Sequence, residues 1–319
     1  MSTMPMYFPQ NFAVSTAVEC ADLVNCAYNQ YTQWYNQDYP DMSGFAWIPN
    51  SAGYDFGSPL YWTYTWLGVT YQEPIGFVAW SNDTAFVVFR GTVSKIDWLY
   101  DAKTDLVGYA QAPGFGNVHE GFSEIYTQLS GQVMTGIGQA SDAATLTNVI
   151  FTGHSLGAGL SSLAVPDVVA NAGLAASVGY LHLNLASPRV GDTTYAAAMN
   201  ASAVPSFRVV NTEDIVPCAP LAVGIANDYE HIGTPINFTA NYGAIDSNHS
   251  LTLSYLYALN NPQSPQNPSP PVALLEASIG PAPIGGITDG QVGGGATLAA
   301  ALIAARGPVP SMASPLPLR

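Results

Sequence analysis

The sequence predicts an α/β fold in which helices flank both faces of a mainly parallel central sheet. The chain has 319 residues, of which 48% are apolar and 9% are charged, so it can bury a sizeable hydrophobic core. Helical and extended patterns alternate along most of its length, and no internal repeat points to another architecture. Strands that alternate with helices form parallel sheets whose faces the helices cover.

The first predicted element is a helix over residues 14–35, where apolar side chains recur at three- and four-residue steps. Runs rich in β-branched and aromatic residues come next, and they predict strands over residues 62–71, 75–81 and 84–90. Glu73-Pro74 and Asn82-Asp83 separate these runs, so we expect a tight connection at each dipeptide.

The second half of the chain continues the alternation. An amphipathic pattern predicts a helix over residues 122–137, which leads into an apolar strand over 146–152. The later elements follow in turn, as helix 156–170, strand 180–186, helix 192–200 and strand 207–210. Joined by helices, these strands are the predicted parallel part of the sheet.

Composition changes sharply near Asn261. The last 58 residues hold 11 of the 24 prolines, 8 glycines and only four charged side chains. We therefore expect residues 1–261 to form the folded domain and residues 262–319 to be a Pro/Gly/Ala-rich tail, serving as a linker or disordered.

The charge balance argues against some partners. Lys and Arg number 7 against 22 Asp and Glu, and the formal net charge of −15 repels a polyphosphate backbone, so no nucleic acid partner is expected.

No stretch reaches the roughly 18 consecutive apolar residues of a transmembrane helix. Residues 1–10 show neither a basic start nor an apolar run, so we expect a soluble protein without a signal peptide, cytoplasmic or exported by another route.

The cysteines give no sign of a metal site. Cys20, Cys26 and Cys218 form no CxxC pair, and their odd number and spacing fit neither a disulfide framework nor zinc binding. The only bridge to consider is one between Cys20 and Cys26.

One short motif carries chemistry, the GxSxG match at residues 153–157 with Ser155 at its centre. The match alone is weak, but it lies between a predicted strand and a predicted helix, as a nucleophile elbow requires. A serine at positive φ in such a turn would collide with side chains two residues away on either side, which accounts for both glycines. The helix that begins at Leu156 would direct free backbone N–H groups at an oxyanion. The alternative is a glycine-rich turn with an idle serine.

A serine nucleophile needs a base, and the chain offers five histidines. His154 is excluded as the base because adjacent side chains diverge at so tight a turn, and His182 alternates with leucines on a predicted strand. His119 and His231 precede glycine-containing turns and are interpreted as structural. His249, the last histidine, lies in a polar loop before a helical run and is the predicted base, because α/β-hydrolases order their elements as serine, acid, histidine.

The acid should follow a strand between the serine and the histidine, because loops at the carboxyl edge of a parallel sheet build the site. Asp214 comes after the predicted strand 207–210 and is the preferred candidate. Glu213 is interpreted as a solvated acid and Asp192 as a helix cap, whereas Asp246 stays open as the main alternative. An ionised carboxylate here would fix the histidine tautomer and stabilise the imidazolium.

Six segments together resemble the class 3 lipases, the fungal-type triacylglycerol lipase family of the α/β-hydrolases. In family order they are residues 89–92, 118–122, the GxSxG elbow, and residues 187–192, 214–217 and 229–233, which read FRGT, VHEGF, GHSLG, SPRVGD, DIVP and YEHIG. The resemblance covers about residues 15–260. It implies the α/β-hydrolase fold and a triad of Ser155, Asp214 and His249, in agreement with the assignment from the residues.

The resemblance also implies that the backbone N–H groups of Thr92 and Leu156 form the oxyanion hole. Family members often carry a short helical lid after the first oxyanion residue, and residues 93–100 occupy that place, with Ile96, Trp98 and Leu99 as apolar contacts. Such a lid could seal the acyl site in water and open at an oil surface. The alternative is a surface helix whose Trp98 packs on the core.

The predicted reaction is carboxylic ester hydrolysis through an acyl-enzyme, with no metal or organic cofactor. The preferred interpretation is that the protein is a lipase. Its partner would then be a lipid or other ester substrate, and an oil–water interface is one place where the two could meet. The alternatives are a phospholipase A1, a feruloyl-type or short-chain esterase, an acyltransferase, and a catalytically silent α/β-hydrolase that serves as a binding module. The sequence predicts neither the oligomeric state nor the acyl-chain preference.

Overall fold

A computed structural model describes residues 3–66, 68–92, 105–220 and 228–268. Its centre is an eight-stranded sheet with the order β1-β3-β4-β7-β8-β10-β12, to which β2 is added beside β3. The strands are β1 (Asp55–Phe56), β2 (Leu60–Trp66), β3 (Val69–Ser81), β4 (Thr84–Phe89), β7 (Asn148–His154), β8 (Gly179–Leu185), β10 (Ser206–Asn211) and β12 (Thr234–Phe238).

The sheet is mainly parallel, as the alternation of helices and strands predicted. β4, β7, β8, β10 and β12 run in one direction, whereas β1, β2 and β3 pair antiparallel at one end. The parallel strands are rich in buried Val, Ile, Leu and Phe, as expected of strands covered on both faces. The loops that follow β4, β7 and β10 meet at the carboxyl edge of the sheet, where α/β proteins place their sites.

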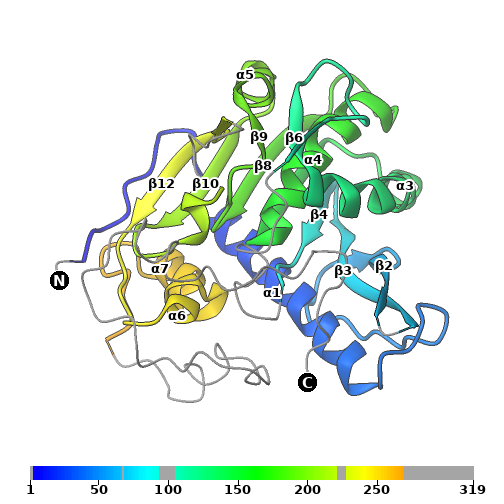
Figure 1. Ribbon diagram of the computed structural model, residues 1–319, viewed down its shortest axis with the longest axis horizontal. Helices are drawn as coiled ribbons and strands as arrows, with labels where there is room; N and C mark the ends of the chain where they lie inside the picture. The colour runs from blue at the N-terminus through cyan, green and yellow to red at the C-terminus, as the bar shows by residue number, and fades with distance from the viewer. Residues whose placement is uncertain (1–2, 67, 93–104, 221–227, 269–319) are drawn as a thin grey trace.

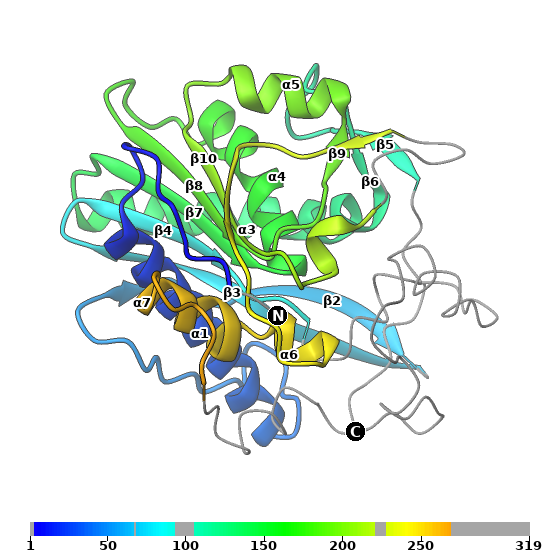
Figure 2. The same ribbon diagram turned by 90° about the vertical axis from the view of Figure 1, so that its left-hand side faces the viewer.

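Helices cover both faces (Figures 1 and 2). One layer holds α3 (Glu120–Ala143), α4 (Leu156–Asn171) and α5 (Thr193–Ala201), and the other holds α1 (Val14–Asn36), α6 (Ile245–His249), the π-helix η2 (Leu251–Leu256) and α7 (Tyr257–Asn260). A 3-10 turn, η1 (Val216–Cys218), follows β10. Each layer closes its own hydrophobic core against the sheet. α4 is buried from Leu156 to Val168 because it lies between the sheet and α3.

A second, four-stranded sheet was not predicted. It has the order β11-β9-β6-β5, with β5 (Leu106–Gly108), β6 (Asn117–His119), β9 (Gly191–Asp192) and β11 (Tyr229–Glu230). These strands are two or three residues long, too short to show a period in the sequence. β12 was also missed, because Pro235 argues against a strand; β12 ends the sheet order, and an edge strand tolerates proline.

One predicted strand and one predicted connection are wrong. Residues 62–71 do not form one strand, because the chain turns back between Trp66 and Val69, with Gly68 at φ 80°. Glu73-Pro74 is no connection but lies inside β3. Pro74 has no N–H to donate, and it is tolerated because the register between β2 and β3 shifts at its partner, between Leu60 and Tyr61. The turn at Asn82-Asp83 is present as predicted.

The described chain continues past Asn261. Pro262 O accepts a hydrogen bond from Met6 N at 2.8 Å, and Gln266 Nε2 donates to Asn241 O at 2.7 Å, so residues 262–267 pack on the domain. The rest of the predicted tail, from residue 269, lies outside the described residues, as do the lid candidates Ile96, Trp98 and Leu99.

The cysteines are free thiols, so the bridge considered between Cys20 and Cys26 does not form. Both lie on α1, and six helical steps separate their Cα atoms by about 9 Å along the axis, beyond the reach of a disulfide. None of the helices in the described ranges is long and apolar enough to cross a membrane.

Candidate active site

Ser155 stands at a sharp turn between β7 and α4, with φ 59° and ψ −127°. A Cβ on Gly153 would come within 2.2 Å of Gly157 O, and one on Gly157 would come within 2.4 Å of Arg90 O. No side chain fits at either position, so both glycines of the motif are required by close backbone approach. The strand, strained turn and helix predicted for a nucleophile elbow are all present.

The loop after β4 packs directly against this turn. A Cβ on Gly91 would lie 2.7 Å from Ser155 Cβ and 2.9 Å from His154 O, so the backbone of Gly91 touches the elbow. Thr92 follows Gly91, and Leu156 is the first residue of α4, where a backbone N–H has no carbonyl of its own helix to bond. The two residues assigned to the oxyanion hole therefore lie in adjoining segments.

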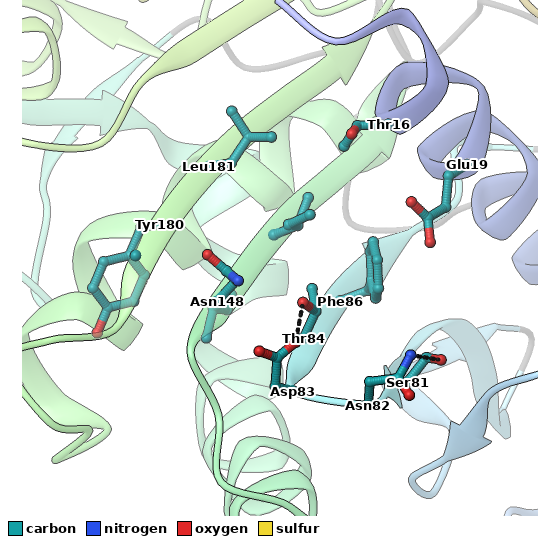
Figure 3. Close-up of a pocket in the computed structure, with 13 residues that line it drawn as sticks. Thr16, Glu19, Ser81, Asn82, Asp83, Thr84, Phe86, Asn148, Tyr180 and Leu181 are labelled. Carbon is teal, nitrogen blue, oxygen red and sulfur yellow. Dashed lines mark hydrogen bonds between the residues drawn. The ribbon is translucent and has the colours of Figure 1, made fainter.

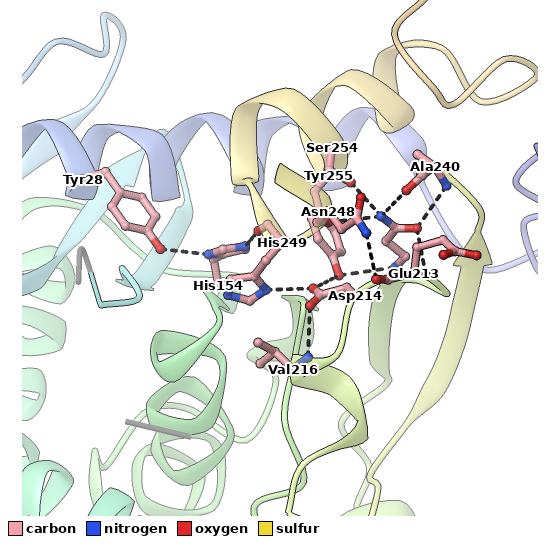
Figure 4. A network of polar contacts seen from close by, with 11 residues as sticks. Tyr28, His154, Glu213, Asp214, Val216, Ala240, Asn248, His249, Ser254 and Tyr255 are labelled. Carbon is pink, nitrogen blue, oxygen red and sulfur yellow. Dashed lines mark hydrogen bonds and ion pairs between the residues drawn. The ribbon is translucent and has the colours of Figure 1, made fainter. Parts of the chain in front are cut away.

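Asp214, which is buried, pairs with His249, which is partly exposed (Figure 4). His249 Nδ1 donates to Asp214 Oδ2 at 2.7 Å, and the Tyr255 hydroxyl donates to the same oxygen at 2.6 Å. The backbone N–H of Val216, at the start of η1, donates to Asp214 Oδ1 at 3.0 Å. Asp214 is only 3% exposed, so these donors replace the water that an ionised carboxylate would otherwise need.

The acids that the sequence considered lie in different settings. Asp214 Oδ2 accepts the hydrogen bond from His249 Nδ1, in keeping with the preferred candidate. Glu213 is not simply solvated, because its carboxylate accepts from Asn241 Nδ2 at 2.8 Å. Asp192 caps α5 as predicted, accepting from Tyr195 N at 2.8 Å. With Nδ1 donating to Asp214, a neutral His249 keeps its Nε2 lone pair as a proton acceptor.

The His249 ring lies beside the elbow. Its centroid is 4.7 Å from that of His154, the residue before Ser155, and His154 Nε2 bonds to His249 O at 2.9 Å. Within the described part of the chain, no hydrogen bond joins the Ser155 hydroxyl to His249. Catalytic hydrogen bonds are often long without substrate and tighten when it binds. The structure therefore brings acid and base into contact and sets the serine next to them.

Three other histidines have hydrogen-bond partners of their own; His119 and His182 are buried, and His231 is partly buried. His119 Nδ1 accepts from Gly121 N at 3.1 Å and caps α3, and burial lowers its pKa to about 4. His182 bonds to Ser206 Oγ at 2.6 Å, and burial lowers its pKa to about 3. His231 bonds to Pro217 O at 2.7 Å, and burial again lowers the pKa to about 3. With its pKa lowered this far, each ring is uncharged at neutral pH.

Sequence reasoning missed the residues that hold the base loop. Asn211, at the end of β10, donates to the carbonyls of Ala240 and Asn248 and to Ser254 Oγ, at 2.8 to 3.0 Å. Asn248 Nδ2 in turn donates to Glu213 O at 3.0 Å. These bonds span about 30 to 40 residues of sequence, and no local pattern marks such partners. The one available signal was an asparagine at the end of a predicted strand, next to the acid.

A pocket of about 380 Å³ lies at the opposite edge of the sheet and contains none of the predicted site residues (Figure 3). The starts of β7 and β8 line it, together with the turn between β3 and β4 and part of α1. Its carboxylates include Glu19 and Asp83. The Asp83 carboxylate is bonded to the Thr147 hydroxyl at 2.6 Å.

Solved structures of fungal lipases share this fold. The native Rhizomucor miehei lipase propeptide complex matches with a TM-score of 0.54 and 22% identity, over 74% of this chain and 72% of that one. A lipase from Rhizopus microsporus var. chinensis gives a TM-score of 0.53 and 23% identity, over 74% and 83%. The fold is thus the α/β-hydrolase fold of the fungal lipases.

Sequence comparison finds a matching family model and several relatives. Residues 86–224 match the family model described as Lipase (class 3). Rhizomucor miehei lipase is 32% identical over 143 residues, 44% of this chain and 39% of the relative. Phospholipase A1-II 3 of Oryza sativa subsp. japonica is 34% identical over 178 residues, 48% and 42% of the two chains. The matches span about two fifths of these relatives' length. The matched segment, which contains Ser155 and Asp214, is thus similar to the class 3 lipases.

Proposed function

We propose that the protein is a serine carboxylic ester hydrolase, and specifically a lipase that cleaves acylglycerols with Ser155, His249 and Asp214. The observation that carries the proposal is the Asp214–His249 pair, packed against the turn that holds Ser155 at positive φ. The match of residues 86–224 to the class 3 lipase family model supports ester chemistry.

In the proposed reaction, Ser155 Oγ attacks the acyl carbonyl while His249 Nε2 takes its proton and passes it to the leaving alcohol. A water molecule activated by His249 then attacks the acyl-enzyme and releases the fatty acid. Asp214 keeps the proton of the neutral base on Nδ1 and stabilises the imidazolium that forms in each step. The N–H groups of Thr92 and Leu156 would bind the negative oxygen of both tetrahedral intermediates. No step requires a metal or an organic cofactor.

The proposed partner is a lipid ester, and the region that would meet an oil–water interface is the lid candidate at residues 93–100. A second candidate function is a phospholipase A1, because the rice relative with that name is 34% identical over 178 residues. Both activities use the same triad on an acyl ester and differ in the group that the pocket accepts on the alcohol side.

The first test is the change Ser155→Ala, assayed on an activated fatty ester. Loss of the nucleophile should lower kcat by about 10⁶, the magnitude seen for triad members in serine hydrolases. Ser161→Ala is the matched control, because Ser161 is fully buried on the same helix and its hydroxyl has no partner within the described residues. Retention of more than a few per cent of activity by Ser155→Ala would exclude this mechanism.

The second assay separates the substrates. Triacylglycerols of graded acyl length are compared below and above their solubility limit, alongside phosphatidylcholine vesicles. Faster hydrolysis of triacylglycerol above the limit supports a lipase, and preferential release of the sn-1 acyl group from phosphatidylcholine supports the second candidate. Cleavage of short soluble esters alone would indicate an esterase, and failure of a fluorophosphonate probe to label Ser155 would contradict an active enzyme.

A further inference from the structure

His154 and Tyr28 form a polar link that the proposed chemistry does not use (Figure 4). His154 is buried at the end of β7, and Tyr28 is a partly buried residue of α1 that packs against the hydrophobic core. The Tyr28 hydroxyl lies 2.8 Å from His154 Nδ1 and 3.0 Å from Gly91 N, and His154 Nε2 lies 2.9 Å from His249 O. Every polar atom of the two side chains therefore has a partner in the site region.

The chemistry of the partners fixes the direction of each bond. The carbonyl of His249 can only accept, so His154 Nε2 carries a proton and donates it. Burial and the neighbouring His249 hold the pKa of His154 well below its usual range, so the ring is neutral and its Nδ1 accepts from the Tyr28 hydroxyl. The Tyr28 oxygen accepts from Gly91 N–H. The result is one directed chain, from Gly91 through Tyr28 and His154 to His249, called here the Tyr28–His154 bridge.

The bridge joins the three segments that hold the proposed reacting groups. Gly91 precedes Thr92, the first proposed oxyanion donor, and its N–H is used by Tyr28, which fixes the orientation of that backbone. His154 precedes Ser155 in the elbow. His249 is held at its ring by Asp214 and at its backbone by His154. These segments lie more than 60 residues apart in the chain, and Tyr28 and His154 alone are separated by 126.

We propose that Tyr28 and His154 are positioning residues, whose bridge holds the oxyanion loop, the nucleophile turn and the base loop in one mutual arrangement. This inference rests on the ester hydrolysis proposed above. A displacement of about 1 Å between reacting groups can cost on the order of 10² in rate, which makes such a link valuable for turnover. Neither residue takes part in the proposed proton transfers, so the loss should fall on kcat and leave KM nearly unchanged.

Kinetics on a soluble p-nitrophenyl ester test the bridge. Tyr28→Phe removes the shared hydroxyl and should lower kcat by about 10- to 100-fold, with KM within about twofold of wild type. His154→Leu removes both ring bonds and should lower kcat by a similar factor. Because the bridge acts as a unit, the double variant should be little worse than the worse single variant.

Two conservative variants cut the bridge at one end each. His154→Gln places an amide near the Nε2 position and can keep the bond to His249 O, whereas His154→Asn places one near Nδ1 and can keep the bond to Tyr28. Each should recover part of the kcat that His154→Leu loses. Tyr195→Phe is the matched control, since Tyr195 is fully buried on the other layer and donates to Ser162 O at 2.7 Å. It should lower the unfolding temperature much as Tyr28→Phe does, with kcat unchanged.

The outcomes separate the two proposals. Wild type that is no faster than Ser155→Ala refutes the proposed function and the role of the bridge in it. An active wild type whose Tyr28→Phe and His154→Leu variants keep kcat within about threefold, or lose it no more than Tyr195→Phe, refutes the bridge alone. If Tyr28→Phe does not fold, His154→Gln and His154→Asn decide, and full activity in both would overturn the proposal. If both single variants fold, additive losses of kcat in the double variant would also overturn it.

Discussion

The two edges of the central sheet differ in how they treat polar groups. At the amino edge, the pocket of about 380 Å³ is lined by polar groups such as Asp83, whose carboxylate is fully exposed to solvent. At the carboxyl edge, Asp214 is 3% exposed and Ser155 2% exposed, and Ser155 adopts a backbone conformation that L-residues rarely occupy. The pocket therefore does not mark the proposed active site. Backbone strain and a buried carboxylate with several hydrogen bonds do mark it.

The physical reason is the environment of the charges. An exposed carboxylate in water interacts weakly with its neighbours, because the solvent screens it. A buried carboxylate that accepts several hydrogen bonds orients its partner strongly, because little water competes for them. The carboxyl edge carries this arrangement and the amino edge does not.

Asp214→Asn tests this contrast with the largest expected effect. The amide can donate to His249 Nδ1 and so favours the wrong tautomer, with the proton on Nε2, while the geometry is kept. We expect kcat to fall by about 10⁴, as for the equivalent change in a serine protease triad. Asp246→Asn serves as the control among nearby acids, and equal losses in the two variants would contradict the assignment of Asp214.

His119→Asn sharpens the comparison at a buried polar group outside the site. The pKa of His119 is lowered by burial to about 4 from its usual 6.5, so the unfolded chain binds more protons between these values and the folded state loses stability as the pH falls. This loss is about 1.4 kcal/mol per pH unit for one histidine. Asparagine can keep the cap at the start of α3 without titrating.

The measurement is the free energy of unfolding from urea titrations between pH 7 and 4. The slope of the unfolding free energy against pH reports the number of protons taken up on unfolding, and for the variant this number should be smaller by up to one. Activity at pH 7 should stay close to that of wild type. An unchanged slope would show that His119 does not titrate on unfolding as expected.

Asp83→Asn at the amino edge should have the smallest effect. Its carboxylate bonds to the Thr147 hydroxyl and its pKa is lowered by that bond, but the group is fully exposed. We expect kcat and KM on the fatty ester to stay within about twofold of wild type, in contrast to Asp214→Asn. A large loss of activity would mean that the pocket at the amino edge communicates with the site.

Sequence patterns were most informative where the signal is local. The glycines at 153 and 157 flank a serine between a strand and a helix, and the structure shows that both are demanded by contacts below 2.5 Å. Asp214 and His249 were selected by their places after a strand and before a helical run, and they are in direct contact. The predicted connection at Pro74 is wrong, because β3 continues through this residue. A register shift between β2 and β3, which the sequence does not reveal, makes the proline tolerable.

The sequence alone predicted the alternation of helices and strands, the elbow at Ser155, and Asp214 and His249 as the preferred acid and base, because each is written in spacing along one short stretch. Only the tertiary structure pairs Asp214 with His249, places Tyr255 and Asn211 beside the pair, and links Tyr28 to His154. These contacts join segments about 30 to more than 100 residues apart, and only the packing of α1, β10 and η2 around the carboxyl edge makes them neighbours.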